Sequence, residues 1–135
     1  MSLIRITVLI VVFSSFYTTS SLADEPRKVI TYSVANERIT LPPRCVKSAI
    51  LREAAVGNSP LLSRSIMFMI QPGAECADHL NAFFERHIGS MVSTRFGQQE
   101  IMQPTKIINA LRVERGFSQY VEDKLLAEEI IATYN

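Results

Sequence analysis

The sequence lacks an excess of charge of either sign. It contains 14 basic and 13 acidic residues, and 13 of each remain if residues 1–23, which include Arg5, are removed. Binding to a nucleic-acid backbone or to an anionic bilayer depends largely on clustered lysine and arginine. This balance argues against nucleic acid as a partner.

The common motifs of catalytic sites are also missing. No Gly-x-Ser-x-Gly turn is present to expose a nucleophilic serine. A loop that holds phosphate groups needs several glycines together, whereas the five glycines here stand apart, at positions 57, 73, 89, 97 and 116. Adjacent acidic residues such as Glu122 and Asp123 point in different directions and indicate a solvated surface. We therefore expect a non-catalytic protein that carries no cofactor.

Metal ligands are sparse as well. A structural zinc site usually takes four cysteine or histidine ligands, and the chain has only Cys45, Cys76, His79 and His87. The two histidines are eight residues apart, which places them about 80° apart around a helix. We expect surface or interface histidines and no metal site.

One long hydrophobic run is present, at the amino terminus, and no second run of membrane-spanning length follows it. Arg5 precedes an apolar core from Ile6 to Phe13, and the segment ends in the small-x-small triplet Ser21-Leu22-Ala23. This layout is typical of a secretory signal peptide spanning residues 1–23. We predict cleavage between Ala23 and Asp24, no stable membrane insertion after cleavage, and a periplasmic or secreted protein.

Both cysteines lie beyond the predicted cleavage site. Exported proteins meet an oxidising environment in which disulfides form and persist. We predict a bridge between Cys45 and Cys76. The alternative is a pair of buried thiols that behave as small hydrophobic side chains.

Alternating and continuous apolar patterns predict several strands. Residues 28–34 and 39–41 are expected to form a hairpin within an amino-terminal extension, residues 24–43. Residues 65–71 form a nearly unbroken apolar run, as expected of a central strand. Residues 91–96 place Val92, Thr94 and Phe96 on one face.

The second half of the chain contains two further predicted strands. A tight turn at Gly97, Gln98 and Gln99 leads into a return strand at 100–103, which Pro104 is expected to interrupt. Residues 106–113 read as another strand, near a sheet edge, because the polarity of both its faces is mixed.

Two amphipathic helices are predicted. The first covers residues 74–87, ends at Gly89 and carries Arg86 and His87 in its last turn, where the helix dipole favours positive charge. The second runs from Gln119 to about Ala132, with Ser118 as its amino-terminal cap. Residues 44–57 fit either a helix or a turn followed by a strand at 49–55.

This order of elements predicts an α+β domain, residues 44–135, in which two helices pack on one face of an antiparallel-rich sheet.

The stretches SIMFMIQPGA, HIG, MVSTRFGQQEIMQPTKI and ERGFSQYVEDKLLAEEI resemble the head subdomain in the first periplasmic region of the SecD and SecF translocation proteins. The resemblance covers roughly residues 44–132 and favours the strand interpretation of 49–55. The membrane helices of that family are absent here, and the loop before Gly116 is shorter. The matching positions are Gly73, Ala74, Ile88, Gly89, Gly97, Pro104, Ile107, Gly116, Phe117, Ser118, Leu126 and Ala127.

The resemblance implies a non-catalytic protein-binding module that serves protein translocation or envelope assembly, with an unidentified protein or polypeptide as partner. The expected contact loops contain Gly97, Gln98, Gln99, Arg112, Glu114 and Arg115. The alternative function is a periplasmic immunity or inhibitor protein that neutralises a toxic enzyme.

Overall fold

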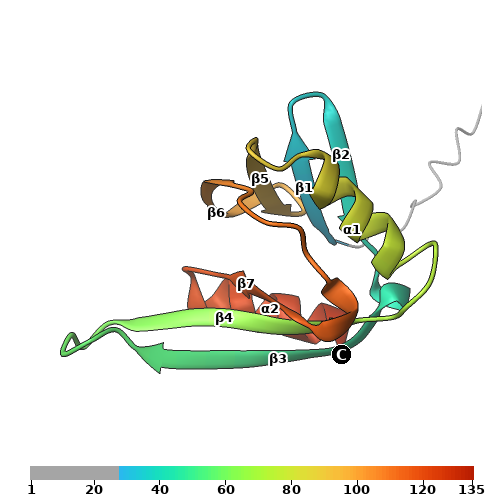
Figure 1. Cartoon of the computed structure of the whole chain (residues 1–135). Coiled ribbons are helices and arrows are strands. Elements are labelled where there is room, and N and C mark those ends of the chain that lie inside the picture. The colour runs from blue at the N-terminus through green and yellow to red at the C-terminus, as the bar shows by residue number, and fades with distance from the viewer. Residues whose placement is uncertain (1–27) are drawn as a thin grey trace, which may run out of the picture.

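The computed structural model describes residues 28–135, so the predicted cleavage site at Ala23 and Asp24 lies outside the described residues. In this part of the chain, seven strands form two antiparallel sheets, accompanied by two α-helices (Figure 1). The predicted α+β class with antiparallel strands is confirmed. The strands are divided between two sheets, where the sequence had suggested one.

The first sheet has four strands in the order β2-β1-β5-β6. The predicted amino-terminal hairpin is confirmed, with Ile30 opposite Leu41. Strand β1 also pairs with β5 on its other side, so the hairpin is an integral part of this sheet. The strands are β1 (Ile30–Val34), β2 (Glu37–Leu41), β5 (Met91–Phe96) and β6 (Gln99–Lys106).

Strand β6 continues through Pro104, so the prediction that this proline interrupts the strand is wrong. The pairing of β5 with β6 shifts between Val92, opposite Thr105, and Thr94, opposite Met102. Two residues of β6, Gln103 and Pro104, therefore face one residue of β5. Such a bulge on an edge strand accommodates a residue without a backbone N–H.

The second sheet has three strands in the order β3-β4-β7, with β4 (Leu62–Ile70) in the centre as predicted. The ambiguous region 44–57 forms a 3₁₀ turn, η1 (Pro43–Cys45), followed by strand β3 (Val46–Ala55). Figure 1 shows the hairpin of β3 and β4 extending beyond the rest of the domain. Strand β7 (Phe117–Tyr120) completes the sheet.

Residues 106–113 do not form the predicted strand. Ile107 still donates its N–H to the carbonyl of Ser90, at 2.9 Å. The chain then runs without regular structure to a second 3₁₀ turn, η2 (Val113–Arg115). This segment connects the first sheet to the second, and its buried residues Ile107 and Val113 pack at its two ends, which explains why apolar residues occur in it without a strand.

The prediction that Ser118 caps the last helix is also wrong. Ser118 lies in β7, opposite Met67 of β4. Helix α2 (Lys124–Tyr134) begins later, where Asp123 Oδ1 accepts a hydrogen bond from the Leu126 N–H at 2.8 Å. The first helix, α1 (Ala77–Arg86), is shorter at both ends than predicted.

Aromatic contacts join the helices to the sheets around one core. The ring of Tyr134 in α2 meets Phe68 of β4 edge to face, and its hydroxyl accepts from the Ile30 N–H and donates to the Leu41 carbonyl. Phe84 of α1 packs edge to face against Tyr32 of β1, with 5.1 Å between ring centroids. No helix among residues 28–135 is long and apolar enough to cross a membrane.

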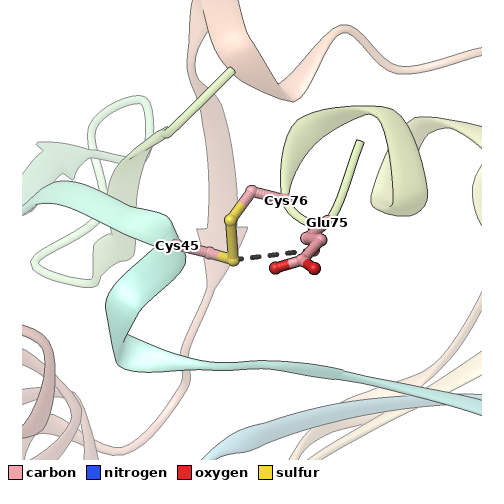
Figure 2. Close-up of a disulfide and its surroundings, with 3 residues drawn as sticks. All are labelled: Cys45, Glu75 and Cys76. Atoms are coloured by element: carbon pink, nitrogen blue, oxygen red, sulfur yellow. Dashed lines mark hydrogen bonds between the residues drawn. A yellow bond between two sulfur atoms is a disulfide. The ribbon is translucent and has the colours of Figure 1, made fainter. Parts of the chain in front are cut away.

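The predicted disulfide is confirmed. Cys45 and Cys76 are bridged, with their Cα atoms 5.2 Å apart, and the bond ties η1 to the start of α1 (Figure 2). The Cys45 side chain is fully buried.

Candidate functional site

An apolar cleft of about 330 Å³ lies between the two sheets. Its size is at the lower end of the range of small-ligand and side-chain binding pockets. Four strands, helix α1 and the segment between β6 and η2 contribute to it. The lining residues are Tyr32, Phe84, Val92, Thr94, Met102, Thr105, Lys106, Ile107, Ile108, Asn109, Leu111, Phe117, Ser118, Gln119 and Tyr120.

A buried polar pair lies in the wall of this cleft. The Tyr32 hydroxyl donates to Gln119 Oε1 at 3.0 Å, and the Gln119 amide donates to the Tyr120 carbonyl at 3.0 Å. The same Gln119 nitrogen lies 3.1 Å from Met102 Sδ in β6. Burial, with a smaller effect of nearby Tyr134, raises the pKa of Tyr32, so its phenol stays neutral. Gln119 thus joins the facing edges of the two sheets.

Both strands at these edges have an unpaired side. Strands β6 and β7 are the outer strands of their sheets, and both line the cleft. The Val121 N–H donates to the Arg64 carbonyl, and the alternation of an antiparallel ladder then directs the backbone groups of Ser118 and Tyr120 away from β4. The Tyr120 carbonyl already accepts a hydrogen bond from the Gln119 side chain. An added strand can therefore use three backbone groups: the N–H and C=O of Ser118 and the N–H of Tyr120.

The predicted contact residues Gly97, Gln98 and Gln99 are exposed and form the tight turn between β5 and β6. Gly97 has a φ of 61°, and its N–H donates to the Val29 carbonyl. The turn thus lies beside the start of β1, and none of its residues lines the cleft.

The second group of predicted contact residues, Arg112, Glu114 and Arg115, lies at η2. Asn81 of α1 holds this turn, because its amide donates to Glu114 at 2.7 Å and its oxygen accepts from the Val113 N–H at 2.9 Å. The hydrogen bond from Asn81, followed by one within Glu114 itself, lowers the pKa of the Glu114 carboxyl. The segment before η2 follows the end of β6, whereas the turn at 97–99 precedes its start, so the two predicted loops adjoin opposite ends of that strand.

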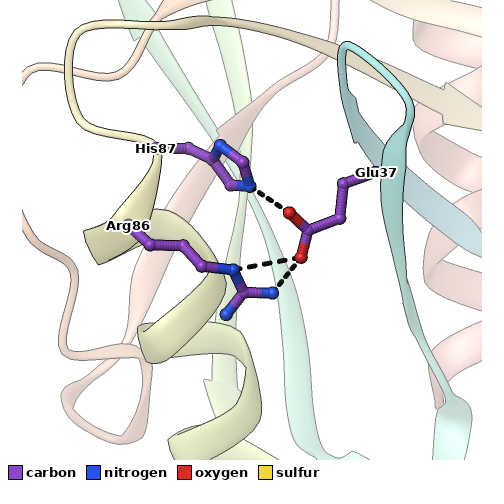
Figure 3. Close-up of polar contacts among 3 residues, drawn as sticks. All are labelled: Glu37, Arg86 and His87. Carbon is purple, nitrogen blue, oxygen red and sulfur yellow. Dashed lines mark hydrogen bonds and ion pairs between the residues drawn. The ribbon is translucent and has the colours of Figure 1, made fainter.

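An ion-pair cluster connects α1 with the first sheet. Glu37 of β2 accepts from Arg86, with the guanidinium Nε 3.0 Å from Oε1, and its second oxygen lies 2.5 Å from His87 Nε2 (Figure 3). The Arg86 hydrogen bond, and then that of His87, lowers the pKa of Glu37. The cluster places His87 in a structural contact, while His79 is exposed on the same helix.

No group of three potential metal ligands is found among residues 28–135. The chain matches no protein-family model, and the searches of curated proteins and of solved structures found no match.

Sequence reasoning missed the residues that build the cleft, above all Tyr32 and Gln119. Tyr32 and Gln119 each lie in a short run of alternating residues. Nothing in either run indicates that the two side chains, 87 positions apart, form a hydrogen bond. A usable signal was the placement of Gln119 among Phe117, Tyr120 and Val121, because a polar side chain in an apolar strand must find a buried partner.

Proposed function

We propose that this chain is an exported, non-catalytic module that binds an extended segment of another polypeptide in the cleft between its sheets. The observation that carries the proposal is the apolar cleft with the free edge of β7 along it. An extended segment can add to a sheet edge through main-chain hydrogen bonds while its side chains occupy a neighbouring pocket. Tyr32 and Gln119 would fix the depth to which such a side chain enters.

Two further features support an exported protein with a role in the cell envelope. The Cys45–Cys76 bridge is typical of proteins that fold in oxidising compartments. The resemblance to the SecD and SecF head subdomain adds a role in protein translocation or envelope assembly, where extended chains are the expected partners.

One observation favours the alternative of an inhibitor or immunity protein. The tip of the β3–β4 hairpin carries the exposed apolar residues Val56, Leu61 and Leu62, and Leu61 is 70% exposed. A projecting apolar tip can enter the cleft of a partner enzyme, and in that case the tip would be the binding surface.

Photo-crosslinking can distinguish these surfaces. A photoreactive residue would replace Ile108 at the rim of the cleft, Leu61 at the hairpin tip, or Leu125 on α2; these side chains are 74%, 70% and 75% exposed. We expect a reproducible adduct from Ile108 in cells, mapped to one extended segment of one partner, and none from the matched control at Leu125. A synthetic peptide of that segment should compete with the adduct.

An adduct from Leu61 alone would move the binding surface to the hairpin and favour the inhibitor. Equal labelling at Ile108 and Leu125, or adducts scattered over many proteins, would contradict binding in the cleft.

A further inference from the structure

A second hollow, separate from the cleft, lies where β2, η1 and the start of α1 meet. It has a volume of about 270 Å³ and is polar, whereas the cleft is apolar. Its lining includes Arg38 and Thr40 of β2, Arg44 of η1, and Glu75 and His79 at the start of α1. Since a water molecule occupies about 30 Å³ in the liquid, the hollow has room for an anion of the size of phosphate.

The strand geometry directs two of these side chains to the same side. Arg38 and Thr40 are two residues apart on β2 and exposed, while Ile39 and Leu41, which alternate with them, are buried. Alternate residues of a strand share a face. A guanidinium and a hydroxyl, both suitable donors to oxyanion oxygens, therefore line the hollow from one strand.

The charges of the hollow are not neutralised by one another. Among residues 28–135, neither Arg38 nor Arg44 forms an ion pair, and neither does Glu75. The two guanidiniums and one carboxylate leave a formal charge of +1. The lining thus favours an anion, and the guanidinium fork suits phosphate or carboxylate.

The disulfide holds the two sides of the hollow together. Arg44 immediately precedes Cys45, and Glu75 immediately precedes Cys76, so the bridge fixes the backbone next to both charged residues (Figure 2). Cys45 Sγ lies 3.7 Å from the carbonyl oxygen of Glu75. A site whose backbone is restricted before binding loses less conformational entropy when the ligand arrives.

We propose that this hollow binds a phosphate group, with Arg38 and Arg44 as the charged donors and with Thr40 and His79 as further contacts. The proposal does not depend on the function of the cleft, because the two hollows share no lining residue. The phosphate can belong to a free small molecule or to a lipid headgroup.

The test uses the oxidised protein at constant ionic strength, followed by amide NMR. Inorganic phosphate and glycerol phosphate are titrated against sodium chloride, and vesicles of phosphatidylglycerol are compared with vesicles of phosphatidylcholine by sedimentation. We expect saturable shifts at Arg38, Thr40, Arg44 and His79 in one of the phosphate arms, or sedimentation with the anionic vesicles, and whichever arm binds names the source of the phosphate.

Variants that are expected to change the affinity in opposite directions make the test specific. Arg38→Gln and Arg44→Gln should each weaken binding about tenfold, as expected for the loss of a charge-assisted hydrogen bond. Glu75→Gln should tighten binding several-fold, because it removes the one negative charge of the lining. Arg52→Gln, an exposed arginine of β3 that does not line the hollow, is the matched control and should bind like the wild type.

Chloride shifts equal to those of phosphate, or unchanged binding in the Arg38→Gln/Arg44→Gln double variant, would overturn the proposal. Amide spectra of the free arginine variants that match the wild type away from the hollow exclude a loss of structure as the explanation, and tighter binding by Glu75→Gln shows that the charge of the lining affects the affinity.

Discussion

At the scale of single residues, charged and polar side chains connect elements that are distant in sequence. Glu37 joins the first hairpin to the end of α1 through Arg86 and His87, and Asn81 joins α1 to η2. Among the described residues, every buried side-chain nitrogen and oxygen has a hydrogen-bond partner. These contacts position helix α1, which carries residues of both the cleft and the polar hollow.

The Glu37 cluster predicts a specific pH dependence of stability. Arg86, with His87 second, lowers the pKa of Glu37 in the folded state below its ordinary value of 4.5. The unfolded chain therefore binds more protons, so the contribution of Glu37 is present above about pH 4.5 and disappears as the pH falls through the folded pKa. Glu37→Gln should be less stable than the wild type at pH 6, and the difference should shrink towards pH 3.

Urea unfolding at a series of pH values measures this difference. The cluster is exposed to solvent, and salt screens such pairs, so 1 M sodium chloride at pH 6 should also reduce the difference. A gap between the two proteins that stays constant from pH 6 to pH 3 would contradict the role of Glu37.

At the scale of elements, the start of α2 gives the sharpest test of the fold. Asp123 caps the helix through the Leu126 N–H, whereas Ser118 lies in strand β7 with an exposed side chain. Asp123→Ala should lower the free energy of unfolding by about 1 kcal/mol, the usual effect of losing a cap. Ser118→Ala should change it by less than about 0.5 kcal/mol.

Chemical denaturation of both variants checks this prediction. A larger loss of unfolding free energy for Ser118→Ala than for Asp123→Ala would mean that the helix begins at Ser118, as the sequence pattern predicted, and that residues 117–120 do not form strand β7.

The sequence predicted the elements whose pattern is set locally. The alternation of Val92, Thr94 and Phe96 in β5 and the tight turn at Gly97 are both confirmed, because the period of a strand and the geometry of a two-residue turn depend on nearby residues alone. The amphipathic stripe of α1, with Leu80, Phe83 and Phe84 buried, is confirmed for the same reason.

The errors concern segments whose conformation depends on distant partners. Residues 117–120 form a strand because β4 offers an unpaired side to them, and their own residues do not reveal this. The residues around Pro104 remain in a strand because Gln103 and Pro104 form a bulge opposite β5. The cleft was not predictable, since it depends on how the two sheets are placed and no local pattern records that placement.

At the scale of the whole molecule, the disulfide is expected to contribute much of the stability. The bridge closes a loop with a sequence separation of 31 residues, and restricting the unfolded chain over such a loop stabilises the folded state by about 3 to 4 kcal/mol. The Cys45→Ala/Cys76→Ala double variant should therefore unfold at a clearly lower denaturant concentration than the oxidised wild type.

Reduced wild-type protein provides the control, because it should unfold close to the midpoint of the double variant. Mass analysis without reductant should show the wild type two hydrogens lighter than its reduced form. Free thiols in protein taken from the exported fraction, or identical midpoints for the oxidised protein and the double variant, would contradict this role.

The two sheets are interleaved along the chain, and this order restricts how the molecule can be made. The first sheet combines residues 30–41 with residues 91–106, and the second combines residues 46–70 with residues 117–120. When the chain is made from its amino terminus, β1 can pair with β2 at once, whereas its second neighbour, β5, follows about sixty residues later. Strand β7 and helix α2 come last. The first sheet needs residues as far as Lys106 and the second as far as Tyr120, so neither sheet can form from the first half of the chain alone. A chain that stops before residue 117 would lack β7, the outer strand beside which we propose that a partner binds.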